Sequence, residues 1–188
     1  MFTGNALHLM TKPPLVPREQ MARSPWMSER RSADALHWTV LPQPDDGAPW
    51  HRDAIVQALE GFDAAPFTLV FDQAEGKRGG HAELRCRRVP RPARLLVDAV
   101  LRHFAAAGIV LKHKARPHVT LDYAWEEADF ATPIRPIVWE VDRLLLIESI
   151  APRRLHIVHG EWPLVPRQGT LFPLRSCDRE AGGPIAAR

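Results

Sequence analysis

Cysteine is almost absent from this sequence, and so are long apolar runs. Only Cys86 and Cys177 occur among the 188 residues, which excludes a disulfide framework and a cysteine-based metal site, so we expect a reducing compartment. No apolar run approaches the roughly 20 residues of a membrane-spanning helix. The start of the chain also lacks the charged and apolar regions of a secretion signal. We therefore expect a cytoplasmic protein with no membrane partner.

An excess of one charge is also missing, because the formal net charge is only +3. The basic residues are nevertheless clustered. One group lies within Arg85–Arg94, and a second consists of Lys112, Lys114 and Arg116. Basic side chains beside a polar cleft suit a polyanion such as RNA, although such clusters also occur as plain solvated surface. We predict that Lys112, Lys114 and Arg116 bind RNA.

Two short segments carry the strongest functional signal, and each contains a His-x-Thr motif followed by an aliphatic residue. They are Leu36–Val40, with His37 and Thr39, and Pro117–Leu121, with His118 and Thr120. Positions i and i+2 of a β-strand point to the same face. Each segment therefore presents one imidazole and one hydroxyl side by side. Two such strands facing each other would combine two titratable groups with two hydrogen-bond donors, a set suited to acid–base chemistry on a phosphate.

The surroundings of the two motifs repeat as well. A short apolar strand at 6–10 precedes the first motif, and an alternating strand at 81–86 precedes the second. Between 82 and 118 an apolar stripe predicts a helix that begins near Pro92 and ends at Gly108, with Leu95, Leu96, Ala99, Val100, Phe104 and Ala107 buried. The equivalent stretch 18–31 is a poorer helix, which Ser24-Pro25 should break or kink. The chain thus contains the pattern strand, helix, His-x-Thr strand twice.

The remaining segments complete one compact α+β domain. We expect a helix at 49–61, capped by Asp45 or Asp46 and burying Ile55, Val56 and Leu59. Strands are expected at 66–71 and, as one long element, at 137–147, which 155–158 would join as a hairpin after a turn at 151–152. The predicted domain covers residues 1–164, and 165–188 form an extended or disordered tail.

This duplicated pattern closely resembles the 2H phosphoesterase superfamily, and within it the 2'-5' RNA ligase-like, RNA 2',3'-cyclic phosphodiesterase group. The match covers about 6–164, and Pro117–Leu121 is similar to the second motif of that group almost letter for letter. The resemblance implies a bilobal fold with two four-stranded, antiparallel-type sheets around a central cleft. It also implies catalysis without a metal or other cofactor.

Carried over residue by residue, the resemblance makes His37 and His118 the catalytic pair and Thr39 and Thr120 the phosphate-binding groups. It orders the pair as His118 the base and His37 the acid, although the residues themselves cannot order it. The partner would be RNA or an oligonucleotide with a 2',3'-cyclic phosphate end, bound by a monomer. Tyr123 is a further candidate for substrate binding, by stacking on a base.

Two alternatives stay open at this point. The chain could be another 2H phosphodiesterase, acting on 2'-5'-linked oligonucleotides or on a small cyclic nucleotide. It could also be a catalytically idle RNA-binding protein with the same fold, although such a protein has no need for paired imidazoles. Metal binding by His156 and His159, or by His113 with His118, is disfavoured because helical spacing and accompanying carboxylates are missing.

Overall fold

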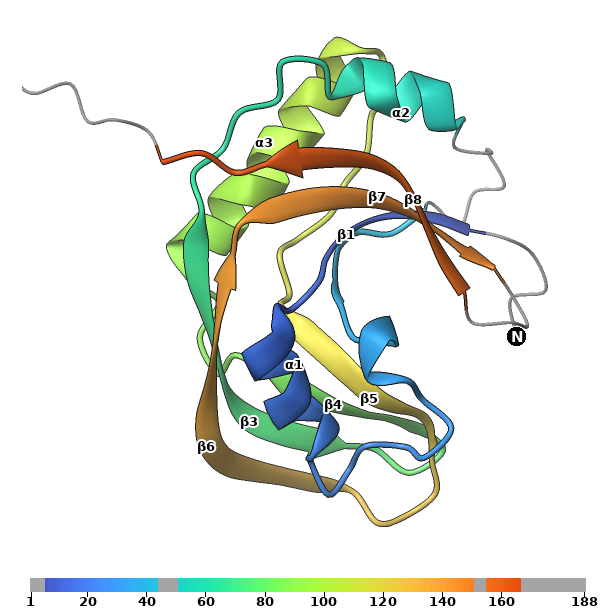
Figure 1. Cartoon of the computed structure of the whole chain (residues 1–188), viewed down its shortest axis with the longest axis vertical. Coiled ribbons are helices and arrows are strands. Elements are labelled where there is room, and N and C mark those ends of the chain that lie inside the picture. The colour runs from blue at the N-terminus through green and yellow to red at the C-terminus, as the bar shows by residue number, and fades with distance from the viewer. Residues whose placement is uncertain (1–5, 44–50, 151–154, 167–188) are drawn as a thin grey trace, which may run out of the picture.

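The computed structural model describes residues 6–43, 51–150 and 155–166, and within them the strands form two four-stranded sheets (Figure 1). The first sheet has the order β2-β1-β7-β8: Trp38–Leu41, Ala6–Thr11, Arg143–Ile150 and Leu155–Pro163. The second has the order β5-β4-β3-β6: His118–Trp125, Gly80–Arg85, Phe67–Gly76 and Phe130–Val141. All neighbouring strands are antiparallel. The α+β class and the two antiparallel sheets are therefore confirmed.

The duplicated unit is also present. In the first sheet β1 leads through helix α1 (Leu15–Ala22) to β2, and β1 and β2 pair antiparallel. In the second sheet β4 leads through helix α3 (Arg91–Ala106) to β5, and these strands pair in the same way. Each His-x-Thr segment thus adds an edge strand beside the strand that opens its unit.

The helices differ from their predicted bounds in instructive ways. α1 begins at Leu15 rather than at Arg18, and it ends at Ala22, just before the Ser24-Pro25 pair that was expected to break a helix. A 3-10 turn, η1 (Ala33–Ala35), follows just before the first motif. The 18–31 helix is therefore wrong over its second half, because a residue before proline disfavours helical backbone.

α3 fits its prediction more closely, although its buried stripe is rotated. Ala93 and Val97 join Leu96, Val100 and Phe104 in the core, whereas Leu95 is 51% exposed and Ala107 lies beyond the helix end. Helix α2 (Arg52–Ala58) is shorter than 49–61 and buries Ile55 but leaves Val56 exposed. Its predicted caps at 45 and 46 lie outside the described residues.

The single strand predicted at 137–147 is wrong. β6 ends at Val141 and β7 begins at Arg143, so the chain leaves one sheet and enters the other at Asp142 (Figure 1). The burial pattern changes at the same place, from alternation along 137–141 to a continuous buried run over 144–147. The hairpin of β7 with β8 is confirmed, and the tail predicted from 165 lies almost wholly outside the described residues.

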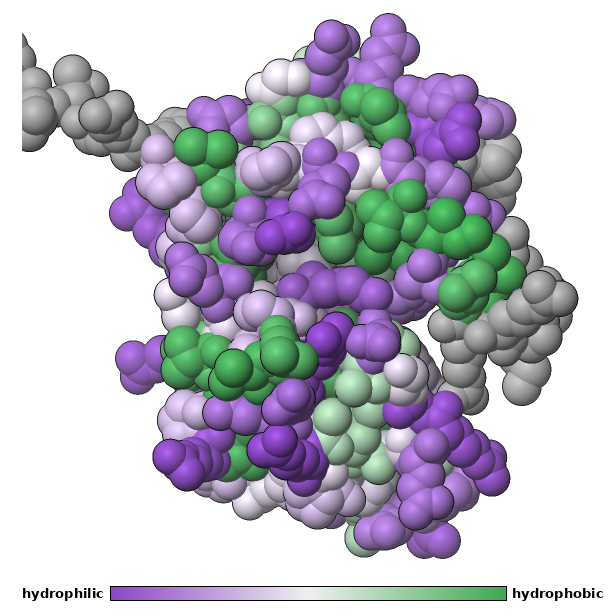
Figure 2. Space-filling view, viewed as in Figure 1, coloured by the Kyte–Doolittle hydropathy of each residue, from purple (hydrophilic) through white to green (hydrophobic). Residues whose placement is uncertain are grey.

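One continuous core joins both sheets. It includes Trp38, Phe71, Phe104 and Trp139, contributed by β2, β3, α3 and β6. On the face drawn in Figure 2, apolar surface occurs in separate patches with hydrophilic side chains between them. Among the described residues no helix has both the length and the apolar character needed to cross a membrane.

Candidate functional site

The two motif strands are neighbours in space. β2 is an edge strand of the first sheet and β5 an edge strand of the second, and these two strands pack against each other. The contact arises because each unit folds its last strand onto the outside of its first. His37, immediately before β2, and His118, the first residue of β5, therefore lie at corresponding ends of two adjoining strands.

The two imidazoles are held in the same way. His37 Nδ1 lies 2.7 Å from the carbonyl oxygen of Ala35, and His118 Nδ1 lies 2.8 Å from the carbonyl oxygen of Arg116. In both cases the partner is the carbonyl two residues earlier. A carbonyl oxygen only accepts, so Nδ1 must carry the proton and donate it. In the neutral form of each ring, Nε2 is therefore unprotonated and can accept a proton, as a proton-transfer residue requires.

His37 lies among other basic groups. Its ring meets that of His156, on β8, edge to face with 5.2 Å between the centroids. Burial lowers the pKa of His37 to about 3, the hydrogen bond to the main chain opposes this, and Arg31, His156 and His8 add repulsion. The pKa of His156 falls to about 4, through burial first and then through Lys12, Arg31 and His8. In the free protein His37 is therefore a neutral imidazole at pH 7.

His118 has a carboxylate beside it instead. Its Nε2 lies 3.8 Å from Glu83 Oε2, on the paired strand β4. Burial lowers the pKa of His118, the charge of Glu83 raises it, and Arg85 and His81 lower it. Arg85 forms ion pairs with both Glu83 and Glu75, so the carboxylate is fixed in place. The two imidazoles thus share a geometry but differ in their electrostatic surroundings.

The two threonines flank the histidines as the strand period predicts. Thr120 is 7% exposed and lies opposite Glu83 in the β4–β5 register, on the face that also carries His118 opposite Arg85. Thr39 is half-buried and pairs with Met10. Two hydroxyls in partly enclosed positions can donate hydrogen bonds to the oxygens of a bound phosphate.

Asp122 departs from the simple alternation. The β4–β5 register shifts so that Glu83 faces Thr120 but Ala82 faces Asp122, which places a bulge at Leu121. The strand period predicts Asp122 on the same face as Thr120, but its partner Ala82 is fully buried whereas Glu83 is not. Asp122 Oδ1 accepts a hydrogen bond from the Ala124 amide.

Tyr123 lies next to this bulge and is 53% exposed. The Arg31 guanidinium stands 4.7 Å from its ring centroid, and the His81 ring meets it edge to face. A hollow of about 420 Å³ borders Tyr123 and Arg31, and its walls come from the segment before β2 and from β5. Tyr123 is thus an exposed aromatic ring held between the segment that leads into the first motif and the strand that carries the second.

The other predicted RNA-binding residues precede β5. Lys112 and Lys114 are exposed, as is Arg116, whose carbonyl holds the His118 ring. Half-buried His113, between the two lysines, has its pKa lowered by burial and by the charge of His118, so this segment runs close to the second motif.

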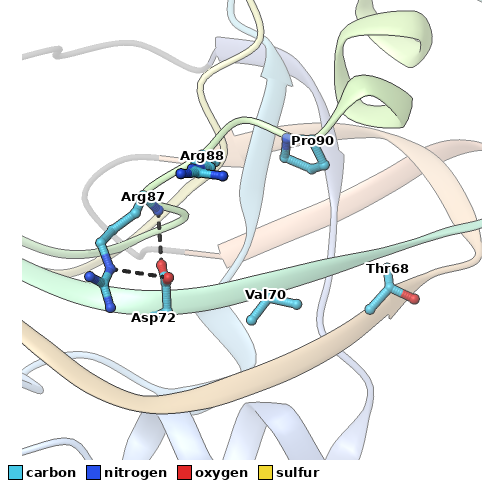
Figure 3. A pocket seen from close by; sticks show the side chains of 6 residues that line it. All are labelled: Thr68, Val70, Asp72, Arg87, Arg88 and Pro90. Atoms are coloured by element: carbon cyan, nitrogen blue, oxygen red, sulfur yellow. Dashed lines mark hydrogen bonds and ion pairs between the residues drawn. The ribbon is translucent and has the colours of Figure 1, made fainter.

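The Arg85–Arg94 group is divided by the fold. Arg85 is held by Glu75 and Glu83, and Arg87 donates to Asp72 from both its amide and its Nε, at 2.9 Å and 3.1 Å. Figure 3 shows the Arg87–Asp72 pair among the residues that line a separate hollow. This hollow has a volume of about 440 Å³ and is lined by Thr68, Val70, Asp72, Arg87, Arg88 and Pro90. None of the four motif side chains lines that hollow.

Several residues beside the motifs were not identified from the sequence. Glu83 could have been found only with the β4–β5 register, which places it opposite Thr120. His8 and His156 reach His37 from distant segments, and Arg31 lies in the segment that leads into the first motif. His159, in contrast, is bound to Glu148 at 2.7 Å. Among the described residues, no group of three or more His, Cys, Asp and Glu side chains is arranged to hold a metal ion.

The fold is similar to that of several solved structures. A crystal structure described as a phosphoesterase is 23% identical with a TM-score of 0.67, covering 86% of this chain and 99% of its own. E. coli LigT complexed with 3'-AMP gives 21% identity, a TM-score of 0.67 and coverage of 86% and 98%. A Thermus thermophilus protein gives 14% identity, a TM-score of 0.64 and coverage of 86% and 99%.

Comparisons that use only the amino-acid sequence find no relatives of this chain. No protein-family model matches the chain, and no curated protein sequence does. The likeness to the solved structures is therefore one of fold, and E. coli LigT is among the structures that share it.

Proposed function

We propose that this chain, which has the fold of 2H phosphoesterases, is a phosphodiesterase that opens terminal 2',3'-cyclic phosphates of RNA to 2'-phosphates. The observation that carries the proposal is the pair of equally held imidazoles on adjoining edge strands, each with a threonine two residues later. LigT of E. coli has been crystallised with 3'-AMP, NADP+ and phosphate. Those ligands support a nucleotide substrate for this fold.

The reaction needs one proton removed and one supplied. A water molecule attacks phosphorus in line with the P–O3' bond and gives its proton to the Nε2 of one imidazole. As the P–O3' bond breaks, the other imidazole, entering as imidazolium, donates its proton to the leaving 3'-oxygen. The products are a 2'-phosphate and a 3'-hydroxyl, with the two histidines left in exchanged protonation states.

The surroundings of the two rings support the order that the family resemblance implies, with His118 the base and His37 the acid. Glu83, 3.8 Å from His118 Nε2, stabilises the imidazolium that forms when His118 takes a proton. His37 has basic neighbours that destabilise its imidazolium. A bound phosphate anion would raise the pKa of His37, and a destabilised imidazolium releases its proton readily to the leaving oxygen.

Thr39 and Thr120 would donate to the two non-bridging oxygens, on which charge develops in the transition state. Lys112, Lys114 and Arg116 would contact phosphates of the RNA, and Tyr123 would stack on a base next to the cleaved group. The exposed positions of the basic residues and of Tyr123 are compatible with these roles.

The test compares turnover of two substrates, a dinucleotide ending in a 2',3'-cyclic phosphate and a 2'-5'-linked oligonucleotide. Phosphorus NMR identifies whether the product carries its phosphate at the 2' or the 3' position. We expect a 2'-phosphate product from the cyclic substrate, with activity unaffected by EDTA. Loss of activity in EDTA that a divalent ion restores would contradict metal-free chemistry. Binding of both RNAs without turnover would favour the idle RNA-binding alternative.

A further inference from the structure

The basic groups around His37 form a cluster larger than one phosphate transfer requires. We use "basic cluster" for His8, Lys12, Arg31 and His156, which together with His37 come from β1, the segments beside it and before β2, and β8. All four are half-buried, so parts of them face solvent. The proposed reaction uses only His37, and the other four have no role in it.

The charges within reach of the basic cluster are mostly of one sign. After burial, repulsion from Arg31, His156 and His8 lowers the pKa of His37. Repulsion from Lys12, Arg31 and His8 likewise lowers the pKa of His156. The carboxylate that acts on Lys12, Asp34, is held by Arg18 at 2.7 Å. Lys12 and Arg31 carry the fixed positive charge of the cluster, whereas His156, with its pKa lowered to about 4, is neutral at pH 7. Two cations beside imidazoles that can take up a proton favour a bound anion.

Two polar atoms of the basic cluster also have no partner in the described part of the chain. Arg31 Nε and His156 Nδ1 are buried and make no hydrogen bond there. Buried polar groups are nearly always paired, so an unpaired one needs an explanation. Arg31 directs its other contacts to the Ala35 carbonyl and to the Tyr123 ring. An anion with several acceptor oxygens would supply the partner that both groups lack.

Resting on the proposed function, we infer that the basic cluster binds a second phosphoryl group: the 5'-phosphate of the same ribose whose cyclic phosphate lies between His37 and His118. The His37 and His156 rings are in edge-to-face contact with 5.2 Å between their centroids, so the basic cluster begins directly beside the proposed cleavage site. A phosphate held by His156, Lys12 and Arg31 would therefore lie near the cleaved group, as the 5'-phosphate of the same ribose does. The site would select 5'-phosphorylated substrates over simple nucleoside cyclic phosphates.

The experiment compares kcat/KM for three substrates: a nucleoside 2',3'-cyclic phosphate, the same compound with a 5'-phosphate, and a dinucleotide with an internal 5'-diester and a cyclic end. For the wild-type protein we expect the 5'-phosphorylated compounds to be preferred by about tenfold or more, the scale of one charged hydrogen bond. In His156→Gln and Lys12→Gln this ratio should fall toward one. His51→Gln and Lys77→Gln, at exposed positions that are not part of the basic cluster, should keep the wild-type ratio.

The outcomes separate the two proposals. Equal kcat/KM for all three substrates would overturn the second phosphate site and leave the proposed function intact. Preference for the dinucleotide or for the terminal 5'-phosphate would support the site and identify which source of phosphate it reads. If no substrate is turned over, the proposed function fails. The phosphate site is then judged by NMR, where 5'-AMP should raise the pKa of His156 in the wild-type protein and an unmoved pKa would overturn it.

Discussion

At the scale of single residues, His37 and His118 are alike in geometry and opposite in surroundings. Both donate from Nδ1 to a carbonyl two residues earlier. Basic groups surround His37, whereas His118 has Glu83 within 3.8 Å. A fixed tautomer leaves Nε2 of both rings able to accept a proton, and the difference in charge around them underlies the proposed assignment of His118 as base and His37 as acid.

Loss of either ring should abolish most of the activity. We expect His37→Ala and His118→Ala each to lower kcat by about 10²–10⁴-fold, the usual scale for removing one acid or base. The double variant should lose much less than the product, because the pair acts as one unit. Single-turnover rates with a cyclic-phosphate dinucleotide measure this. Wild-type rates in a folded single variant would show that the duplicated motif is only structural.

Glu83 should set the pH dependence of the base. Its charge raises the pKa of His118, so Glu83→Gln should move the ascending limb of the pH–rate profile to lower pH and reduce kcat. Glu75→Gln is the matched control, since Glu75 binds Arg85 without an ion pair to His118. If the ascending limb of the pH–rate profile lies at the wild-type pH in both variants, Glu83 does not affect the pKa of the base.

At the scale of elements, the motif strands and the segment leading into β5 place the functional groups. β2 and β5 are edge strands of different sheets, and they contact each other. The segment before β5 carries Lys112, Lys114 and Arg116 to the same region. Because the chain is nearly neutral overall, a local basic segment of this kind would dominate its interaction with phosphates.

Changing that segment should weaken RNA binding in a salt-dependent way. For the triple variant Lys112→Gln, Lys114→Gln, Arg116→Gln, we expect a flatter plot of log affinity against log salt, by about 0.7 for each single-strand phosphate that is no longer neutralised. Fluorescence anisotropy with a labelled oligonucleotide measures the slope. The control Lys77→Gln, Arg78→Gln removes exposed charge from the β3–β4 turn. An identical slope in wild type and triple variant would show that the segment is only a solvated surface.

At the scale of the whole molecule, the low pKa values of His37 and His156 connect the site to stability. The two histidines have pKa values of about 3 and about 4 in the folded protein, against 6.5 ordinarily. Between these values the unfolded chain binds more protons than the folded one, so the free energy of unfolding must fall as pH falls below 6.5. The candidate site thus makes the fold sensitive to acid.

Replacing these two groups should reduce that sensitivity. In the variant His37→Asn, His156→Gln, the drop in Tm between about pH 7 and about pH 5 should be smaller than in wild type, by about 2–4 °C for each kcal/mol recovered. Inorganic phosphate should reduce the drop in Tm of the wild-type protein, because a bound anion favours the protonated form of the two rings. Thermal scans read by circular dichroism would measure both effects. Equal drops in variant and wild type would contradict the low pKa values.

The local sequence pattern was sufficient to predict many of the helices and strands, but it did not predict which sheet each strand joins. The motif strands, α3 and the β7–β8 hairpin follow from periodicity and from turn residues within a few positions. The break between Val141 and Arg143 could not be predicted, because the apolar run continues across it in the sequence. Which sheet a strand joins is decided by the surface that it covers, and that surface belongs to distant segments.

The same division holds for the candidate site. By itself the sequence determined the two His-x-Thr units and the shared face of each imidazole and hydroxyl, because that face depends only on the strand period. Only the tertiary structure decided that Glu83 stands beside His118 and that His8, Lys12, Arg31 and His156 gather around His37. Strand register and the packing of edge strands make those contacts, and they join residues far apart in the chain. The charges that tune each imidazole are therefore a property of the fold.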